Sequence, residues 1–177
     1  MRLFHFSEDP SIGRFVPRPV AMPSQRIAGR DWLNGPLVWA IDDWHQPMYF
    51  FPRDCPRILL WSRPHSTAAD RDAWFQGSHA RILAHVEQAW LDRVTATAIH
   101  RYELPADNFE DLEDAGMWVS RGPVAPLAVE TLSDLPAAMV AANVELRVVP
   151  SLVPLRRALD TTLHFSGIRL RNAQGWT

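Results

Sequence analysis

The chain has 177 residues, of which 47% are hydrophobic and 21% are charged, and its formal net charge is −2. An apolar fraction close to the globular average excludes a disordered chain, a collagen and a coiled coil. The longest apolar run, residues 137–142, is far shorter than the roughly 20 residues of a membrane-spanning helix. The first nine residues lack the apolar stretch of a signal peptide. These features predict one globular domain, residues 1–177, located in the cytoplasm.

Two features of the residue usage limit the chemistry. All 18 basic residues are arginine, which excludes Schiff-base chemistry, a pyridoxal-phosphate lysine and a phosphate-loop lysine. Cys55 is the only cysteine, so an intrachain disulfide and a multi-cysteine metal site are also excluded. Because Cys55 lies between Asp54 and Pro56, we expect a buried and unreactive thiol.

The hydrophobic pattern predicts an α+β fold, a single compact domain with a mixed, mostly antiparallel sheet flanked by short helices. Short apolar or alternating runs predict strands at residues 2–6, 36–41, 57–61, 98–104, 117–120, 127–132 and 144–149. Capping residues followed by apolar periodicity predict helices at residues 42–50, 67–77, 79–93, 134–142 and 151–162. We expect a Pro/Arg-rich flap over residues 10–35 and an extended C-terminal segment over residues 163–177.

The clearest helical pattern lies at residues 79–93, after a capping Ser78. Ile82 and Val86 fall on an apolar stripe at helical spacing, while His85 falls on the opposite, polar stripe. The pattern therefore predicts an amphipathic helix that leaves His85 exposed.

Charge is unevenly distributed along the chain. Residues 10–30 carry four arginines and no acid, and residues 107–114 carry five carboxylates and no base. These segments are either solvated loops, or an arginine-rich flap over an anionic ligand opposite an acidic loop. The nearly balanced net charge does not favour nucleic acid as the sole partner.

Three segments contain candidate functional residues. His5 lies in the first predicted strand, where a histidine either binds a ligand with little loss of entropy or is a core residue bonded to backbone. The segment 39–45 runs from a buried strand into a helix start, which either seats an anion or is only architecture. Glu113 is the best placed carboxylate of the acidic stretch. No calcium-loop or zinc signature is present, so the sequence predicts no metal site.

Five motifs recur in the order of one known family. They are HFSEDP at residues 5–10, WAIDDWH at 39–45, FPRDCPR at 51–57, DLEDAGMWVS at 111–120 and HFSGIR at 164–169. On these motifs the chain resembles an uncharacterised bacterial family, a domain of unknown function. This resemblance implies no activity.

A second resemblance, to the ADP-ribosyltransferase-like superfamily, covers about the first fifty residues. Leu3-Phe4-His5 is similar to the first strand of those domains, which ends in a histidine that contacts NAD. Residues 37–42, running on to Tyr49, resemble a later strand that leads into a helix with an aromatic residue. The third element, a glutamate near a late strand, is matched by Glu113 or by Glu130.

The superfamily resemblance implies NAD as cofactor and a role for each matched residue. His5 would orient the nicotinamide ribose, Tyr49 would stack on the ring, and Glu113 would stabilise an oxocarbenium-like transition state. An arginine of the flap would pair with the pyrophosphate. The expected cofactor-binding residues are His5, Ser7, Trp39, Asp42, Arg18 and Arg53.

The superfamily resemblance therefore favours a domain that binds a small nucleotide-like ligand, NAD or ADP-ribose, and that resembles an ADP-ribosyltransferase. Two alternatives stay open. One is a non-catalytic ligand-binding or protein-interaction domain. The other is a metal-assisted hydrolase that uses His5, His45 and the acidic loop. No pattern indicates the oligomeric state.

Overall fold

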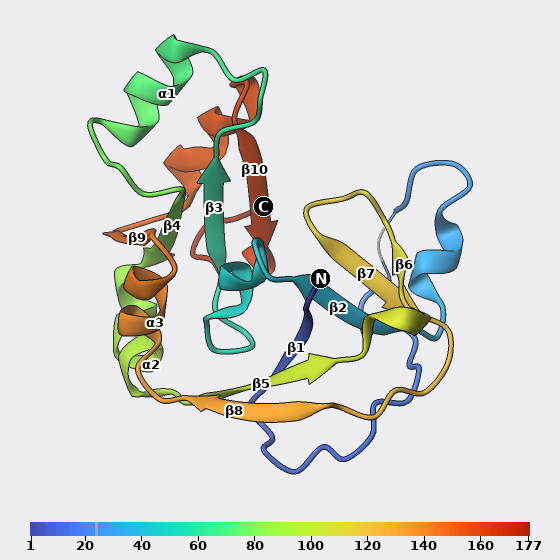
Figure 1. Cartoon of the computed structure of the whole chain (residues 1–177). Helices are drawn as coiled ribbons and strands as arrows, with labels where there is room; N and C mark the ends of the chain where they lie inside the picture. The colour runs from blue at the N-terminus through green and yellow to red at the C-terminus, as the bar shows by residue number, and fades with distance from the viewer. Residues whose placement is uncertain (24) are drawn as a thin grey trace. The chain divides into compact units, whose positions relative to one another are not determined.

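The computed structural model describes residues 1–23 and 25–177 and shows an α+β fold with two sheets (Figure 1). Ser24, within the predicted flap, lies outside the described residues. The chain divides into two units, each of two segments: Met1–Gln46 with Ile99–Thr131, and Pro47–Ala98 with Leu132–Thr177. The α+β prediction is confirmed, with one antiparallel and one mixed sheet in place of a single mixed sheet. That the whole chain is one domain stays a prediction.

Within the described residues, six strands form the antiparallel sheet of unit 1 in the order β6-β7-β2-β1-β5-β8. Their bounds are β1 Leu3–Ser7, β2 Val38–Asp42, β5 Ile99–Leu104, β6 Glu110–Asp111, β7 Met117–Ser120 and β8 Ala128–Leu132. The N-terminal strand β1 lies between β2 and β5, and Leu3 is opposite both Asp42 and Leu104. Two 3₁₀ helices, Asp31–Asn34 and Ala106–Asn108, lie in the connections of this unit.

Both faces of this sheet bury apolar side chains. One face carries a cluster of Leu3, Phe15, Val38, Ala40, Tyr102, Leu104 and Val124. A second cluster joins Leu33, Leu37, Leu112 and Val119, with Trp39 packed against it. Because side chains alternate along a strand, Ala40 and Asp42 of β2 share the first face and Trp39 takes the opposite one.

The predicted flap is attached to the sheet by backbone pairing. Phe15 pairs with Val124, and Arg18 pairs with Leu37, through antiparallel bridges. The Arg30 guanidinium donates to the backbone oxygen of Leu112 at 3.1 Å. One arginine of the flap thus contacts the acidic stretch through its backbone.

Unit 2 holds a mixed sheet in the order β10-β3-β4-β9, in which only β4 and β9 run parallel among the described strands. The strands are β3 Arg57–Trp61, β4 Ile82–Glu87, β9 Val144–Val149 and β10 His164–Ile168. Its helices are α1 Ala68–Phe75, α2 Leu91–Ala96 and α3 Leu135–Ala141, with 3₁₀ helices Gln88–Trp90, Val153–Asp160 and Leu170–Asn172. A further 3₁₀ helix, Gln46–Tyr49, begins at the last residue of the first unit 1 segment.

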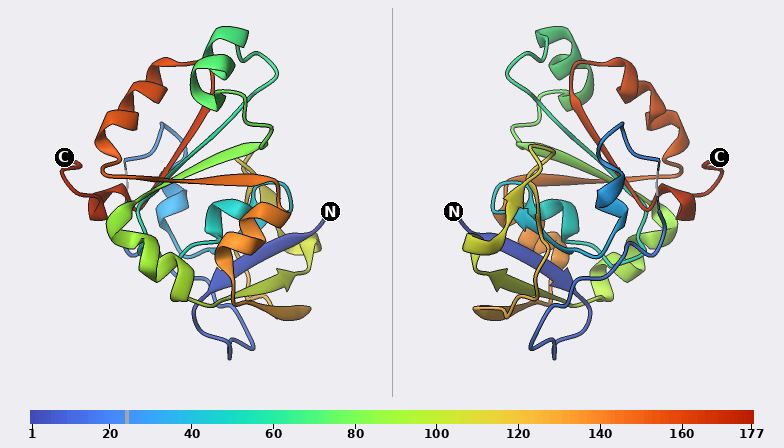
Figure 2. Two further views of the ribbon diagram at one scale, coloured as in Figure 1. Left: turned by 90° about the vertical axis from the view of Figure 1, so that its left-hand side faces the viewer. Right: turned by 90° about the vertical axis from the view of Figure 1, so that its right-hand side faces the viewer.

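The core of unit 2 lies between its sheet and two helical segments. Leu60 and Leu83 of neighbouring strands join one buried cluster with Trp74 of α1 and Leu155 of the 3₁₀ helix Val153–Asp160. Figure 2 shows α1 in green near this orange-red 3₁₀ helix, while α2 and α3 lie beside each other. Thr67 caps α1 by accepting from the backbone N–H of Asp70, as its sequence predicts.

The predicted helix over residues 79–93 is wrong. Its first half is the strand β4, Ile82–Glu87, and only residues 91–96 form the helix α2. Every residue of β4 is buried: the strand lies between β3 and β9 in the sheet, and its Leu83 packs with Trp74 and Leu155 in the core cluster. His85 is therefore 2% exposed rather than on a solvated face. An apolar run buried on both sides matches helical spacing by chance.

Other boundaries follow the sequence closely. The strands predicted at residues 57–61, 117–120 and 144–149 are confirmed with the same bounds. The helices predicted at residues 42–50 and 151–162 are shorter 3₁₀ segments, and the C-terminal segment contains β10 and a 3₁₀ helix. Among the described helices, none is long and apolar enough to cross a membrane.

Candidate functional site

An aspartate and a histidine form a close pair where β2 ends in unit 1. His45 Nδ1 lies 2.9 Å from Asp42 Oδ1 and 3.0 Å from Oδ2. The backbone N–H of His45 also donates to Asp42 Oδ1, at 2.7 Å. Both side chains are about one fifth exposed. The pair is thus held by ring and backbone contacts and remains accessible to solvent.

The ionised state of Asp42 determines which nitrogen of the neutral His45 ring carries the proton. Burial raises the pKa of the Asp42 carboxyl, but the hydrogen bonds from the His45 ring and backbone outweigh burial and hold the pKa below its ordinary value. An ionised carboxylate only accepts hydrogen bonds, so the proton of the neutral ring is on Nδ1. Nε2 is then the basic nitrogen, which is the arrangement of an acid–base histidine oriented by a carboxylate.

The turn between β6 and β7 contacts this pair. Gly116 accepts a hydrogen bond from the backbone N–H of Asp42 at 2.9 Å. Glu113 lies in the same turn, is exposed, and donates its N–H to Asp111 Oδ1 at 2.8 Å. The pairing of β2 with β7 therefore brings the acidic turn to the Asp42–His45 pair.

His5 shares a sheet face with Asp42. It alternates with Leu3, and Leu3 is opposite Asp42, so His5 and Asp42 point to the same side. His5 Nδ1 donates to the Trp39 carbonyl at 2.8 Å, which makes Nε2 the acceptor nitrogen of the neutral ring. The ring of Phe15 lies 4.6 Å from the His5 ring between centroids.

The other predicted cofactor-binding residues of unit 1 do not all lie on the face that carries His5 and Asp42. Ser7 follows His5 on the same face, and its hydroxyl accepts from the Asp9 N–H at 3.1 Å. Trp39 lies on the opposite face, and its buried indole N–H has no hydrogen-bond partner among the residues that the structure describes. Arg18 is exposed on the flap. His5, Ser7 and Asp42 are therefore the ones that share a face.

Tyr49 and Arg53 belong to unit 2. The Arg57 guanidinium lies 5.6 Å from the centroid of the Tyr49 ring. The backbone oxygen of Arg53 accepts from the Arg169 guanidinium at 3.3 Å. Cys55 is buried, and burial raises the pKa of its thiol to about 11, as expected for an unreactive cysteine. The functional roles of Tyr49 and Arg53 stay predictions.

Three or more metal-ligating side chains do not converge anywhere in residues 1–23 and 25–177. A resident catalytic metal is held in most proteins by three or more such side chains. For the hydrolase alternative, no such group of three ligands includes His5 or His45 in the described part of the chain.

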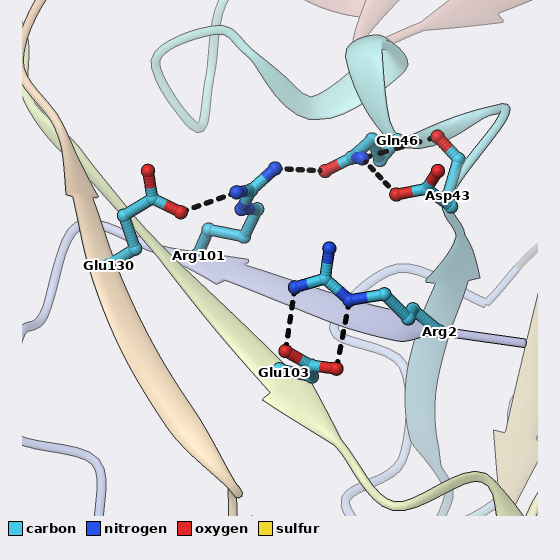
Figure 3. A network of polar contacts seen from close by, with 6 residues as sticks. All are labelled: Arg2, Asp43, Gln46, Arg101, Glu103 and Glu130. Carbon is cyan, nitrogen blue, oxygen red and sulfur yellow. Dashed lines mark hydrogen bonds and ion pairs between the residues drawn. The ribbon is translucent and has the colours of Figure 1, made fainter.

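A second polar cluster lies on unit 1, around Arg101 (Figure 3). The guanidinium of Arg101 donates to Gln46 Oε1 at 2.9 Å and to a carboxylate oxygen of Glu130. Gln46 in turn donates to the side chain and backbone oxygens of Asp43. Asp43 and Gln46 have the spacing of a capping box, but here Gln46 donates to Asp43, whereas in a capping box each side chain accepts from the backbone N–H of the other residue. Because Arg101 pairs with Glu130 and the Asp43 carboxylate accepts from Gln46, we interpret this cluster as structural.

Replacing Arg101 by leucine is expected to lower the free energy of unfolding by about 1–2 kcal/mol. The variant loses the hydrogen bonds to Gln46 and Glu130 and the contact of the guanidinium with the Phe4 ring. Urea unfolding measures the change. Arg121→Leu is the matched control, since Arg121 also pairs with a glutamate but is 61% exposed, and its effect is expected to be much smaller. Equal effects would contradict a structural role for the Arg101 cluster.

The spacing of Asp42 and His45 in the sequence is compatible with a contact between them, but the sequence analysis did not predict this pair. An aspartate three residues before a histidine, at the end of a buried strand, places both side chains on one turn. No local sequence pattern could have predicted the role of Gly116, because residue 116 and residues 42 and 45, which lie close together in the structure, are far apart in the sequence.

The comparisons with known proteins define a family but no activity. No curated protein and no solved structure matches the chain. The likeness to ADP-ribosyltransferase-like domains therefore stays a prediction. Residues 4–173 match DUF6886, a family of unknown function, and the chain belongs to that family.

Proposed function

We propose that the protein is an enzyme in which His45, oriented by Asp42, transfers protons, and that its ligand is a nucleotide-like molecule such as NAD or ADP-ribose. The observation that carries the catalytic part is the close contact of His45 Nδ1 with both oxygens of Asp42. Nε2 accepts a proton from an attacking hydroxyl or water, and the imidazolium returns it to the leaving group.

A neighbouring aromatic residue supports the ligand class. Trp44 is 42% exposed, and its ring centroid lies 4.6 Å from that of His45. A half-exposed indole offers a face on which a nicotinamide or adenine ring stacks. The exposed Arg18 offers a cation for the diphosphate of such a ligand.

A second candidate, the transferase-like site, is supported by the fixed orientation of His5. Its ring is held by the Trp39 carbonyl on the face that also carries Asp42. In this arrangement His5 orients the ribose of NAD and Glu113 stabilises an oxocarbenium-like transition state.

Ligand titration with parallel product analysis tests the proposal. We expect ADP-ribose or NAD at 100 times its dissociation constant to add about 2.7 kcal/mol to the free energy of unfolding, seen as a higher Tm. His45→Gln is expected to keep this binding and to lose about 100-fold or more in turnover, followed by NMR of the ligand. Trp44→Ala is expected to weaken binding.

His65→Gln is the matched control, because His65 is exposed and lies in unit 2. It should change neither binding nor turnover. Turnover that His45→Gln leaves intact, but His5→Ala or Glu113→Gln abolishes, would favour the transferase-like site. Binding without turnover by the wild type would indicate a binding module, and no binding of either ligand would contradict the proposed ligand class.

A further inference from the structure

The turn that contacts the Asp42–His45 pair has an unusual backbone. Glu113, Ala115 and Gly116 have φ angles of 52°, 46° and 71°, all in the left-handed region. Residues with a side chain adopt this region at an energetic cost, so the surrounding structure must hold the turn in place. Hydrogen bonds do so on both sides, from Leu112 N–H to the Met117 oxygen and from Asp42 N–H to the Gly116 oxygen.

Gly116 lies directly against the polar pair. A Cβ atom built on Gly116 would be 2.3 Å from His45 Nδ1 and 2.5 Å from Asp42 Oδ2. Real Cβ atoms essentially never approach other heavy atoms within 3.0 Å. The two atoms concerned are those that form the hydrogen bond between ring and carboxylate. Any side chain at residue 116 would therefore separate them or move them together.

We infer that Gly116 is a positioning residue: because it has no side chain, the Asp42–His45 pair can pack directly against its backbone and keep its geometry. The inference rests on the proposed function for its catalytic meaning. The turn Glu113–Gly116 would then set the direction of the basic Nε2 of His45.

Three glycine-to-alanine variants in unit 1 separate this role from backbone strain. Gly116→Ala introduces both strain and the contact with the pair. Gly29→Ala introduces strain alone, because Gly29 has a φ of 83° and open space around its Cβ position. Gly122→Ala introduces neither, since its Cβ position is open and its φ lies outside the left-handed region.

The readouts are the Asp42 carboxyl pKa, from ¹³C NMR titration, and the protonated nitrogen of the His45 ring, from ¹⁵N NMR. In the wild type we expect the lowered Asp42 pKa and a proton on Nδ1. In Gly116→Ala the Asp42 pKa should rise and the Nδ1–H signature should disappear. Gly29→Ala should lower only the Tm, and Gly122→Ala should change neither readout. A Gly116→Ala variant that behaves like Gly29→Ala would overturn the inference.

A triple variant covers the case in which Gly116→Ala does not fold. His45→Ala and Asp42→Ala together remove the three atoms nearest to the new Cβ, so Gly116→Ala combined with both should recover folding to the level of Gly29→Ala. Failure to recover would show that the clash is not with the pair and would overturn the inference. Disturbed NMR signatures in Gly116→Ala, together with full turnover by His45→Gln, would leave the positioning role standing and refute the proposed function instead.

Discussion

Replacing Leu60 by alanine is expected to lower the free energy of unfolding by about 2–5 kcal/mol. Leu60 is fully buried in β3, between β10 and β4, and belongs to the cluster that includes Trp74 and Leu83. The truncation removes apolar contacts and leaves a cavity that the paired strands close only in part. Urea unfolding at constant pH, analysed with a shared m-value, measures the loss.

Leu159→Ala is the control for this change. Leu159 lies in the same unit, at the end of the 3₁₀ helix Val153–Asp160, and is 61% exposed. Its truncation is expected to change the free energy of unfolding by about 0.5 kcal/mol or less. A similar loss in the two variants would contradict the placement of Leu60 in the core.

Acidification is expected to destabilise the protein through a buried histidine. Burial lowers the pKa of His85 from 6.5 to about 4; Arg147 lowers it further, while the hydrogen bond to the Ile58 oxygen and Glu145 act in the opposite direction. Below pH 6.5 the unfolded chain takes up a proton that the folded chain refuses until pH is about 4. This stability is therefore present above pH 6.5 and is lost as the pH falls to about 4.

The expected size of this loss is about 3 kcal/mol, from the shift of the His85 pKa. Denaturant unfolding across this pH range measures it, with each variant compared with its own value at neutral pH. His85→Leu should remove this part of the pH dependence, and the exposed His65→Gln should keep it. An unchanged pH dependence in His85→Leu would show that His85 titrates normally in the folded protein.

The strands were predictable where burial and pairing agree with a local pattern. The run Arg57–Trp61 is apolar over a strand length, and Met117–Ser120 follows a turn rich in acids and glycine. Neither run is long enough for a stable helix, so only an extended conformation buries it. For these segments the local composition and the tertiary structure both favour a strand.

The strand β4 was not predictable by the same reasoning. Its central position in the sheet depends on pairing with β3 and β9, and β9 follows it by more than fifty residues. Without knowledge of that pairing, the spacing of Ile82 and Val86 is equally compatible with a helix. The error carried over to His85, whose burial follows from the sheet and not from its neighbours in sequence.

The candidate site was predictable in part for a similar reason. His5 stands in a strand that its alternating pattern predicted, whereas Asp42, predicted to begin a helix, is the last residue of β2. The structure places both on one face. The contact of His45 with Asp42 is local, but the sequence reading assigned that segment to a helix cap. The contribution of Gly116 depends on the β2–β7 pairing, which no local pattern contains.

The division of each unit into two separate segments has a consequence for how the chain is made. Strand β1 leaves the ribosome well before its partner β5, which begins only at Ile99. At about 5–20 residues per second, synthesis of the intervening residues takes roughly 5–20 seconds. During that time one edge of β1 has no native partner, and a chaperone or another nascent chain can pair with it. In a fragment cut after Gln46, one edge of β1 would likewise lack its partner β5. Joining Gln46 directly to Ile99 would instead supply the strands of unit 1 in one short polypeptide.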